Sequence, residues 1–184
     1  MASDTLLMSI RESFGRVVYT HKTHEKQIEI LCFYEKTARW LEAVLISLTA
    51  GGAITLLFGQ GFWLQLVTAI LASAATLVTI YQLSFDPGRL IRDHRKCARR
   101  LWLIREKYIN LLSDLIDEAI DDDKGRLQRD TILKELQEIY LEAPDTSSKA
   151  YSMAQGALKI KEEMSFTDDE IDQFLPKPLR KGGK

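Results

Sequence analysis

A few polar side chains in a long uncharged stretch are the residues of this sequence best placed to do chemistry. Residues 43–85 contain no Lys, Arg, Asp or Glu, although these types make up 28% of the chain. At ~100° per residue, one side of a helix through this stretch carries small and polar residues, namely Gln65, Thr68, Ala72, Thr76 and Thr79. Such a face avoids lipid. It either lines a pore made by several copies or packs against other helices through small residues and hydroxyl groups.

Two further features border or share this uncharged stretch. Glu42 precedes it directly, and could either pair with Arg39 or Arg89 or form an acidic ring at the cytoplasmic mouth of a pore. Such a ring would attract cations. On the first half of the stretch, a ridge of small residues is predicted to be a helix-packing surface, formed by Ser47, Gly51 and Thr55.

Outside this stretch the sequence contains no recognisable catalytic motif. Walker A, dinucleotide-binding, HExxH, paired CxxC and nucleophile-elbow patterns are absent. The residues Asp121–Asp123 have no partner motif for Mg²⁺ and are interpreted as a solvated helix end. The histidines and cysteines are expected to be core residues rather than a pH sensor or reactive thiols, and they are His21, His24, His94, Cys32 and Cys97. We therefore predict no enzyme activity, no metal and no cofactor.

The uncharged stretch is long enough for two membrane crossings. Gly59-Gln60-Gly61 divides it, and we predict spans at about 41–58 and 62–83. The second span has ~22 residues, enough to cross a ~30 Å hydrocarbon core, whereas the first reaches that length only with Trp40 and Leu41. A soluble bundle would have to bury both segments beneath the rest of the chain, which is too charged for that. The prediction is a transmembrane hairpin at 43–85.

Basic residues flank the hairpin on both sides and predict its orientation. The residues after it include Arg89, Arg92, Arg95, Lys96, Arg99, Arg100 and Arg105. Since Lys and Arg stay on the cytoplasmic side, both termini should be cytoplasmic in a multi-pass protein of the inner membrane. The chain as a whole has 25 basic and 26 acidic residues, so no direct nucleic-acid binding is expected.

Heptad-like spacings predict that two long helices pack together beneath the membrane. Apolar and histidine residues alternate by four and three in residues 4–41, and they are Ile10, Phe14, Val17, His21, His24, Ile28 and Leu31. After Asp86-Pro87, a helix start with Asp86 as its N-cap, the same alternation continues to about Ala119. Its members are Leu90, His94, Cys97, Leu101, Ile104, Tyr108, Leu111 and Leu115. Pairing these two seams extends the hairpin into the cytoplasm.

Shorter helices are expected in the remaining chain. One covers 126–142, with contacts expected from Leu127, Leu133, Leu136 and Tyr140, and a weaker one covers 149–164. A capping box at Thr167–Glu170 precedes a short helix over 171–175. The predicted organisation is therefore a cytoplasmic N-terminal helix at 1–42, the hairpin at 43–85, a cytoplasmic helical region at 86–175 and a flexible basic tail at 176–184. The fold class is an all-α membrane protein.

Two spans with cytoplasmic helices, together with two C-terminal segments, resemble the SLATT family of two-transmembrane effector domains. These segments are RDTILKELQEIYLEAPDTSSKAY (Arg129–Tyr151) and EEMSFTDDEIDQFLP (Glu162–Pro176). The resemblance implies a prokaryotic anti-phage effector that oligomerises and breaches the inner membrane, killing or arresting the infected cell. It also implies a separately encoded sensor, either a nucleotide-messenger synthase or a reverse transcriptase. It supplies no catalytic residues.

Two functions of different classes follow from the sequence. The first is a homo-oligomeric pore-forming effector of the abortive infection type. The alternative is a non-conducting membrane scaffold whose cytoplasmic helices dock a partner protein. A small transporter is disfavoured, because the spans contain no charged residue to couple transport.

Overall fold

The computed structural model describes residues 3–55, 57, 59, 61–164, 166–176 and 180. Over this part the chain is all-helical, without strands. Its helices, in chain order, are α1 (Asp4–Thr55), α2 (Phe62–Phe85), α3 (Pro87–Ile116), α4 (Asp122–Glu142), α5 (Ser148–Lys159) and α6 (Asp168–Phe174).

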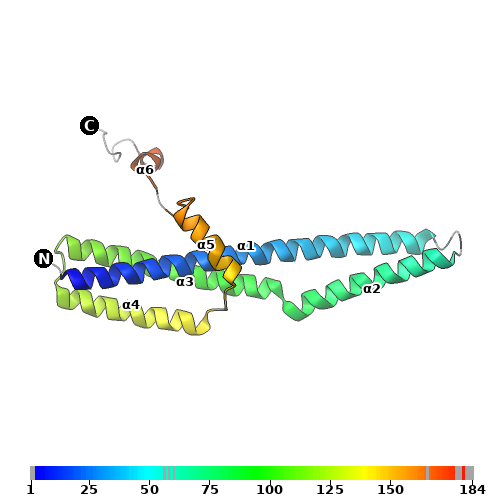
Figure 1. Cartoon of the computed structure of the whole chain (residues 1–184), viewed down its shortest axis with the longest axis horizontal. Helices are drawn as coiled ribbons and strands as arrows, with labels where there is room; N and C mark the ends of the chain where they lie inside the picture. Colours follow the sequence, from blue (N-terminus) through cyan, green and yellow to red (C-terminus); the bar gives the residue numbers. More distant parts are fainter. Residues whose placement is uncertain are drawn as a thin grey trace.

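Helix α1 is the axis of the molecule. It has 52 residues without a break, which corresponds to ~78 Å at 1.5 Å per residue, and Gly15 does not interrupt it. Its N-terminal part packs with α3 and α4, and its C-terminal part lies along α2 (Figure 1). The predicted N-terminal helix therefore continues into the first apolar segment without a break.

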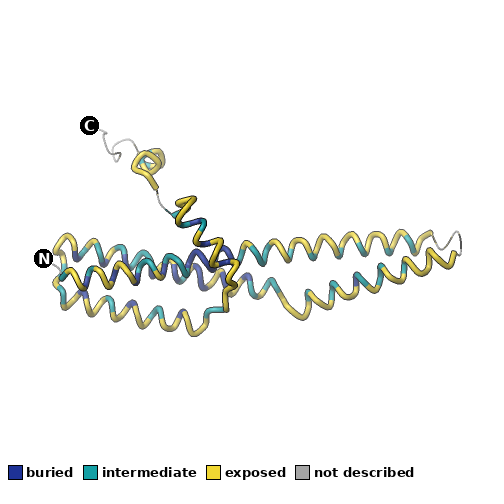
Figure 2. Tube along the Cα trace, viewed as in Figure 1, coloured by how far each residue is buried: buried dark blue, intermediate teal, exposed yellow. Residues whose placement is uncertain are grey.

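The core lies between α1 and α3, where the two predicted seams meet. None of the predicted seam residues is exposed, and the most buried ones form one continuous cluster. Figure 2 shows this buried region confined to the half of the molecule that contains α3, α4 and α5, whereas the α1–α2 hairpin is largely exposed. The predicted pairing of the two long helices is therefore confirmed.

Asp86 separates α2 from α3, as the sequence predicts. Its side chain accepts a hydrogen bond from the backbone N–H of Arg89 at 2.9 Å, and Pro87 occupies the first turn of α3. Asp86 itself has a φ of 35°, in the left-handed region, and its own N–H closes the last turn of α2 on the carbonyl of Gln82. One residue thus ends one helix and caps the next, and the chain changes direction there (Figure 1).

The contact face predicted for α4 is wrong. Leu127, Leu133 and Tyr140 are exposed, and only Leu136 of the four expected residues packs against the core. The buried positions are Gly125, Ile132 and Ile139. Gly125 allows the close approach of α4, because a Cβ there would lie 2.8 Å from Leu115 Cδ2.

Several predicted boundaries also change. Asp121 caps the start of α4 rather than ending the preceding helix, and α3 ends at Ile116 rather than near Ala119. Helix α5 ends at Lys159, five residues before the predicted Met164. The capping box at Thr167 and Glu170 is confirmed. Of the predicted basic tail, residues 177–179 and 181–184 lie outside the described part of the chain.

Candidate functional site: the apolar hairpin

Helix α2 has the length and composition of a membrane span. Among the described residues, one helical stretch, Phe62–Ile116, contains a segment long and apolar enough to cross a bilayer. That segment falls in α2, because α3 is rich in charge. Only 6% of it is buried within the chain, whereas the core helix of a soluble protein would be mostly buried.

The first predicted span does not meet the same criterion, so the two-span hairpin is not confirmed as a whole. Helix α1 is described only to Thr55, and residues 56 and 58 of the predicted span 41–58 lie outside the described part. A stretch of spanning length that ends at Thr55 must include Arg39 and Glu42. The central residue of the predicted turn, Gln60, is also outside the described part.

The structure divides the polar face predicted on α2. Thr68, Ala72 and Thr79 are half-buried on the side that faces α1, whereas Gln65 and Thr76 are exposed. A Cβ at Gly52 of α1 would collide with the hydroxyl of Thr68, so the two helices approach each other closely at this point. The Thr76 hydroxyl donates to the carbonyl of Ala72 at 2.9 Å within its own helix.

Glu42 holds α1 to α2 at the end of the hairpin nearest to α3. Its carboxylate accepts hydrogen bonds from the hydroxyl of Thr79 and from Nε2 of Gln82, the latter at 2.8 Å. Of the two alternatives that the sequence offers, pairing with Arg39 is not observed, because Arg39 binds Glu35 at 2.6 Å, and the acidic ring stays a prediction. A carboxylate at a membrane boundary is costly unless it is hydrogen-bonded, and two donors from α2 supply that here.

The ridge of small residues on α1 points away from α2. Ser47, Gly51 and Thr55 are exposed, so they do not form a packing surface inside the hairpin. The half-buried positions that face α2 are Glu42, Leu45, Thr49 and Gly52. The exposed ridge is consequently available only for lipid or for another polypeptide.

Sequence reasoning missed Gln82 and Gly52 as hairpin contacts. The sequence did contain a signal for Gln82, because it follows Thr79 by three residues and so lies on the same helix face. The spacing of Ser47, Gly51 and Thr55 placed Gly51 in the predicted packing surface, whereas the adjacent Gly52 is the glycine that contacts α2. Periodicity identifies a face but not the helix that covers it.

A second polar cluster lies in the α1–α3 core, outside the hairpin. Nδ1 of His24 is 2.8 Å from Nδ1 of His94, and Nε2 of His24 is 3.4 Å from Sγ of Cys97. Burial, followed by the neighbouring histidines, lowers the pKa of His24 to about 4, and burial also lowers the pKa of His94. Burial raises the pKa of the Cys97 thiol to about 11. This cluster is therefore neutral at pH 7, and its thiol is not an activated nucleophile.

The neutral histidine pair predicts acid sensitivity of the fold. A histidine whose pKa is lowered on folding contributes full stability above its unfolded pKa of ~6.5 and loses it as the pH falls, because the unfolded chain takes up protons first. The loss is at most about 1.4 kcal/mol per pH unit for each histidine. The thermal midpoint of the detergent-solubilised protein should therefore fall by several degrees between pH 7.5 and 5.5.

The matched control replaces both members of the pair. The variant His24→Leu/His94→Leu should lose much of this pH dependence, since it keeps the volume and removes the pair, and His21, whose pKa burial also lowers, should account for the rest. The carboxylates whose pKa is lowered by hydrogen bonds, such as Glu142 and Glu163, lose stability only at more acid pH. An unchanged slope in the double variant would show that other groups cause it.

No metal or catalytic arrangement emerges from the described residues. Within them, no three His, Cys, Asp or Glu side chains are placed to hold a metal ion. Asp121 and Asp122 act in the first turn of α4, where Asp121 accepts from the N–H of Lys124 at 2.9 Å and Asp122 accepts from the N–H of Ser3 at 3.1 Å. Their geometry is that of helix caps.

Comparison with known protein families gives one match. The family model SLATT_4, described as SMODS and SLOG-associating 2TM effector domain family 4, matches residues 6–170. The match covers the core helices, the hairpin and most of the C-terminal region. Searches of curated proteins and of solved structures gave no match.

Proposed function

The chain belongs to the SLATT_4 family of 2TM effector domains, and we propose that it is an oligomeric membrane effector of a prokaryotic anti-phage defence system. In this proposal several copies form a pore in the inner membrane, or otherwise disrupt it, and so arrest or kill the infected cell. The description of the family already associates it with conflict and defence systems of the SMODS and SLOG type.

The observation that carries the proposal is the exposed surface of the hairpin. Helix α2 is almost entirely uncovered and apolar, which suits lipid. Gln65 and Thr76, however, are exposed polar residues on the same helix. Polar side chains in a span face protein or water rather than lipid. Two helices cannot enclose a water path, so these residues favour assembly with further copies.

The proposed topology places both termini in the cytoplasm and the turn between α1 and α2 outside. The α3–α4–α5 region follows α2 directly and carries the basic residues that stay on the cytoplasmic side. A reporter that is active only in the cytoplasm should be active when it is fused after Lys184. Activity restricted to the periplasm would overturn this topology.

A separately encoded sensor is proposed to trigger the effector. By resemblance to relatives, the sensor is a nucleotide-messenger synthase or a reverse transcriptase. The sensor would contact the exposed surfaces of α3 to α6, because the core between α1 and α3 is buried.

Permeability of liposomes that contain only the purified protein tests the proposal. A pore should dissipate an imposed K⁺ diffusion potential, and leakage should rise more steeply than linearly with protein density because copies must assemble. Liposomes that hold their potential at densities where crosslinking detects oligomers would instead identify a non-conducting scaffold. The same measurement in induced cells with a potential-sensitive dye extends the test to the native membrane.

Glu42 is predicted to influence which ions pass. Its carboxylate lies at the cytoplasmic end of the hairpin, where a ring of such groups from several copies would favour cations. Glu42→Gln keeps a hydrogen-bond acceptor for Thr79 or Gln82 and removes the charge. Reversal potentials in planar bilayers should therefore move toward lower cation preference, while assembly persists.

The comparison with Glu42→Ala separates charge from structure. The alanine variant removes the charge and both hydrogen bonds, so it should also weaken the contact between α1 and α2. If Glu42→Gln leaves the reversal potential unchanged, the carboxylate has only the structural role of joining the two helices.

A further inference from the structure

We propose that α6 of one copy docks into the groove between α1 and α3 of a neighbouring copy, so that the copies join head to tail. This inference rests on the proposed homo-oligomer and supplies an interface for it. It involves only the cytoplasmic part of the chain. The shape and charge of the groove, together with the composition and position of α6, support this docking.

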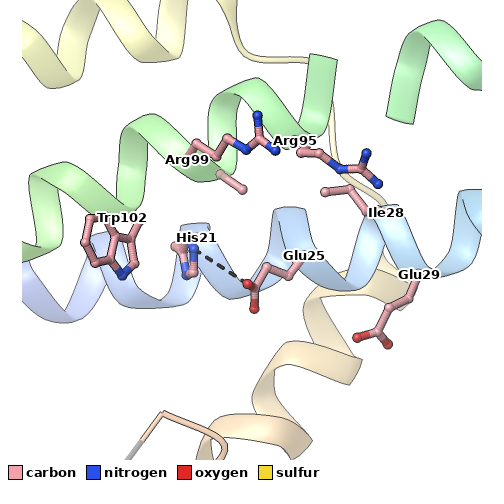
Figure 3. Close-up of a pocket in the computed structure, with 8 residues that line it drawn as sticks. His21, Glu25, Ile28, Glu29, Arg95, Arg99 and Trp102 are labelled. Carbon is pink, nitrogen blue, oxygen red and sulfur yellow. Dashed lines mark ion pairs between the residues drawn. The ribbon is translucent and has the colours of Figure 1, made fainter. Parts of the chain in front are cut away.

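The groove lies beside the core, along residues 21–29 of α1. It has a volume of about 520 Å³ and is open to solvent. Figure 3 shows side chains from α1 and α3 facing each other across it. The lining residues are His21, Glu25, Ile28, Glu29, Arg95, Ala98, Arg99 and Trp102.

The charge of the groove is dominated by two arginines. Arg95 and Arg99 are exposed, lie one turn apart on α3, and within the described part of the chain have no carboxylate within 4.0 Å. The acidic residues opposite them pair with lysines of α1, since Glu25 binds Lys22 at 2.8 Å and Glu29 binds Lys26 at 2.9 Å, and both lysines are shared with Glu163. In Figure 3 the only ion pair drawn joins His21 to Glu25. The arginines are thus available to an acidic ligand.

An apolar surface adjoins these arginines. Trp102 is half exposed at one end of the groove, and Ile28 is half-buried toward the other end (Figure 3). A complementary ligand therefore carries carboxylates to meet the guanidinium groups and an apolar side chain to cover the indole. Such a ligand is an acidic amphipathic helix.

Helix α6 has this composition. Its sequence DDEIDQF carries four acids and no basic residue, and it also carries Ile171 and Phe174, three residues apart on one helix face. Phe174 is 80% exposed, so its ring is accessible to a partner. The capping box of Thr167 and Glu170 stabilises the helix locally, so α6 is pre-organised for binding.

The position of α6 favours docking to another copy over docking to its own groove. Glu163 binds the nearly buried Lys22 and Lys26 at 2.9 and 3.1 Å, which ties the segment after α5 to the side of α1 that faces α5. From there the chain leads away from the bundle, and α6 stands apart from it (Figure 1). A heterologous contact of this kind closes into a ring when the rotation between copies permits.

Disulfide crosslinking between two differently tagged full-length chains tests the inference in membranes. One chain carries Phe174→Cys and the other carries Trp102→Cys, and both carry Cys32→Ser. Cys97 is retained because its buried thiol has a raised pKa. Mild oxidation should link the two chains to each other. Absence of a mixed dimer, together with an internal disulfide in a chain carrying both new cysteines, would overturn the proposal in favour of docking within one copy.

Charge reversal on each side provides the matched control. Arg95→Glu/Arg99→Glu in the groove chain should lower the yield of mixed dimer about tenfold or more, because acidic residues then face acidic residues. Asp169→Lys/Asp172→Lys in the α6 chain should do the same. Combining the two reversed chains should restore the yield. If the lysine substitutions acted only by unfolding α6, the combination would not restore it. Failure of the combination to restore it would contradict a direct contact.

Truncation distinguishes this inference from the proposed function. A chain that ends at Met164 lacks α6 but keeps Glu163. If it oligomerises and leaks like the full chain, the docking of α6 is wrong and the pore stands. If mixed dimers form through α6 in liposomes that hold their potential, the docking stands and the pore is wrong.

Discussion

Replacing Leu101 with aspartate should remove the folded protein from the membrane. Leu101 is fully buried in the α1–α3 core, and the substitution would place an unpaired carboxylate there. We expect a cost of about 4 kcal/mol or more. Domains are commonly stable by only ~5–15 kcal/mol, so this loss is a large fraction of the total. Immunoblots of membrane fractions should show a severe fall in the full-length protein.

The neighbouring Leu103 offers a control of the same residue type. It lies two positions further along α3 and is 50% exposed, so Leu103→Asp should change stability by about 0.5 kcal/mol or less. The two variants have the same composition and net charge. Abundant, assembled Leu101→Asp protein would contradict the pairing of α1 with α3, and equal loss of both variants would indicate a general effect of added charge on insertion.

The sequence was sufficient to predict this pairing because the pattern is long and regular. The alternation by four and three persists in both helices, and its members, including Val17 on α1 and Leu111 on α3, are buried. Asp86 and Pro87 were predictable for a different reason, since an N-cap followed by proline is a local signal. Long periodic patterns and local caps do not depend on a distant partner.

The contact face of α4 could not be predicted by choosing its largest apolar residues. Leu127 and Tyr140 are exposed, whereas Gly125 and Ile139 are buried. The buried positions do follow a heptad, but its first member is a glycine, whose contribution is close approach to Leu115 rather than apolar area. Hydrophobicity alone therefore selected the wrong face.

The partners of polar residues in the hairpin were equally inaccessible to sequence reasoning. The sequence left two alternatives for Glu42, a pair with Arg39 or Arg89 and an acidic ring, and neither includes Thr79 and Gln82, which hydrogen-bond it. The rotation of α2 about its own axis determines which residues face Glu42. That rotation is coupled to the close approach of α1 and α2 at Gly52 and Thr68, and no local pattern determines it.

The rotation of α2 about its axis reduces the number of polar residues that could line an ion path. Thr68 and Thr79 are turned toward α1, so of the predicted pore-lining residues Gln65 and Thr76 remain exposed, with Ala72 at the edge. Any path through an assembly of hairpins must use surfaces that α1 leaves uncovered. Thr76 lies near the middle of α2 and is the candidate with the largest expected effect.

Replacing Thr76 with phenylalanine should abolish permeability while the oligomer remains. The substitution adds bulk and removes a hydroxyl, which favours a dewetted constriction in a narrow path. The hydroxyl bonds only to Ala72 within the same helix among the described residues, so its loss should not disturb the contact with α1. Membrane potential and crosslinked oligomer should be measured in the same cells, and toxicity should disappear with depolarisation.

The adjoining Leu77 supplies the control, because it is 67% exposed and its exchange for isoleucine or valine should be nearly silent. Val78 is less suitable, since it is half-buried toward α1. If the polar face only packs, Thr76→Phe should reduce the oligomer, and any change of permeability should follow that loss in proportion. Intact oligomers of Thr76→Phe that still depolarise cells would exclude this face from the path, because a phenylalanine from every copy would then stand in it without effect.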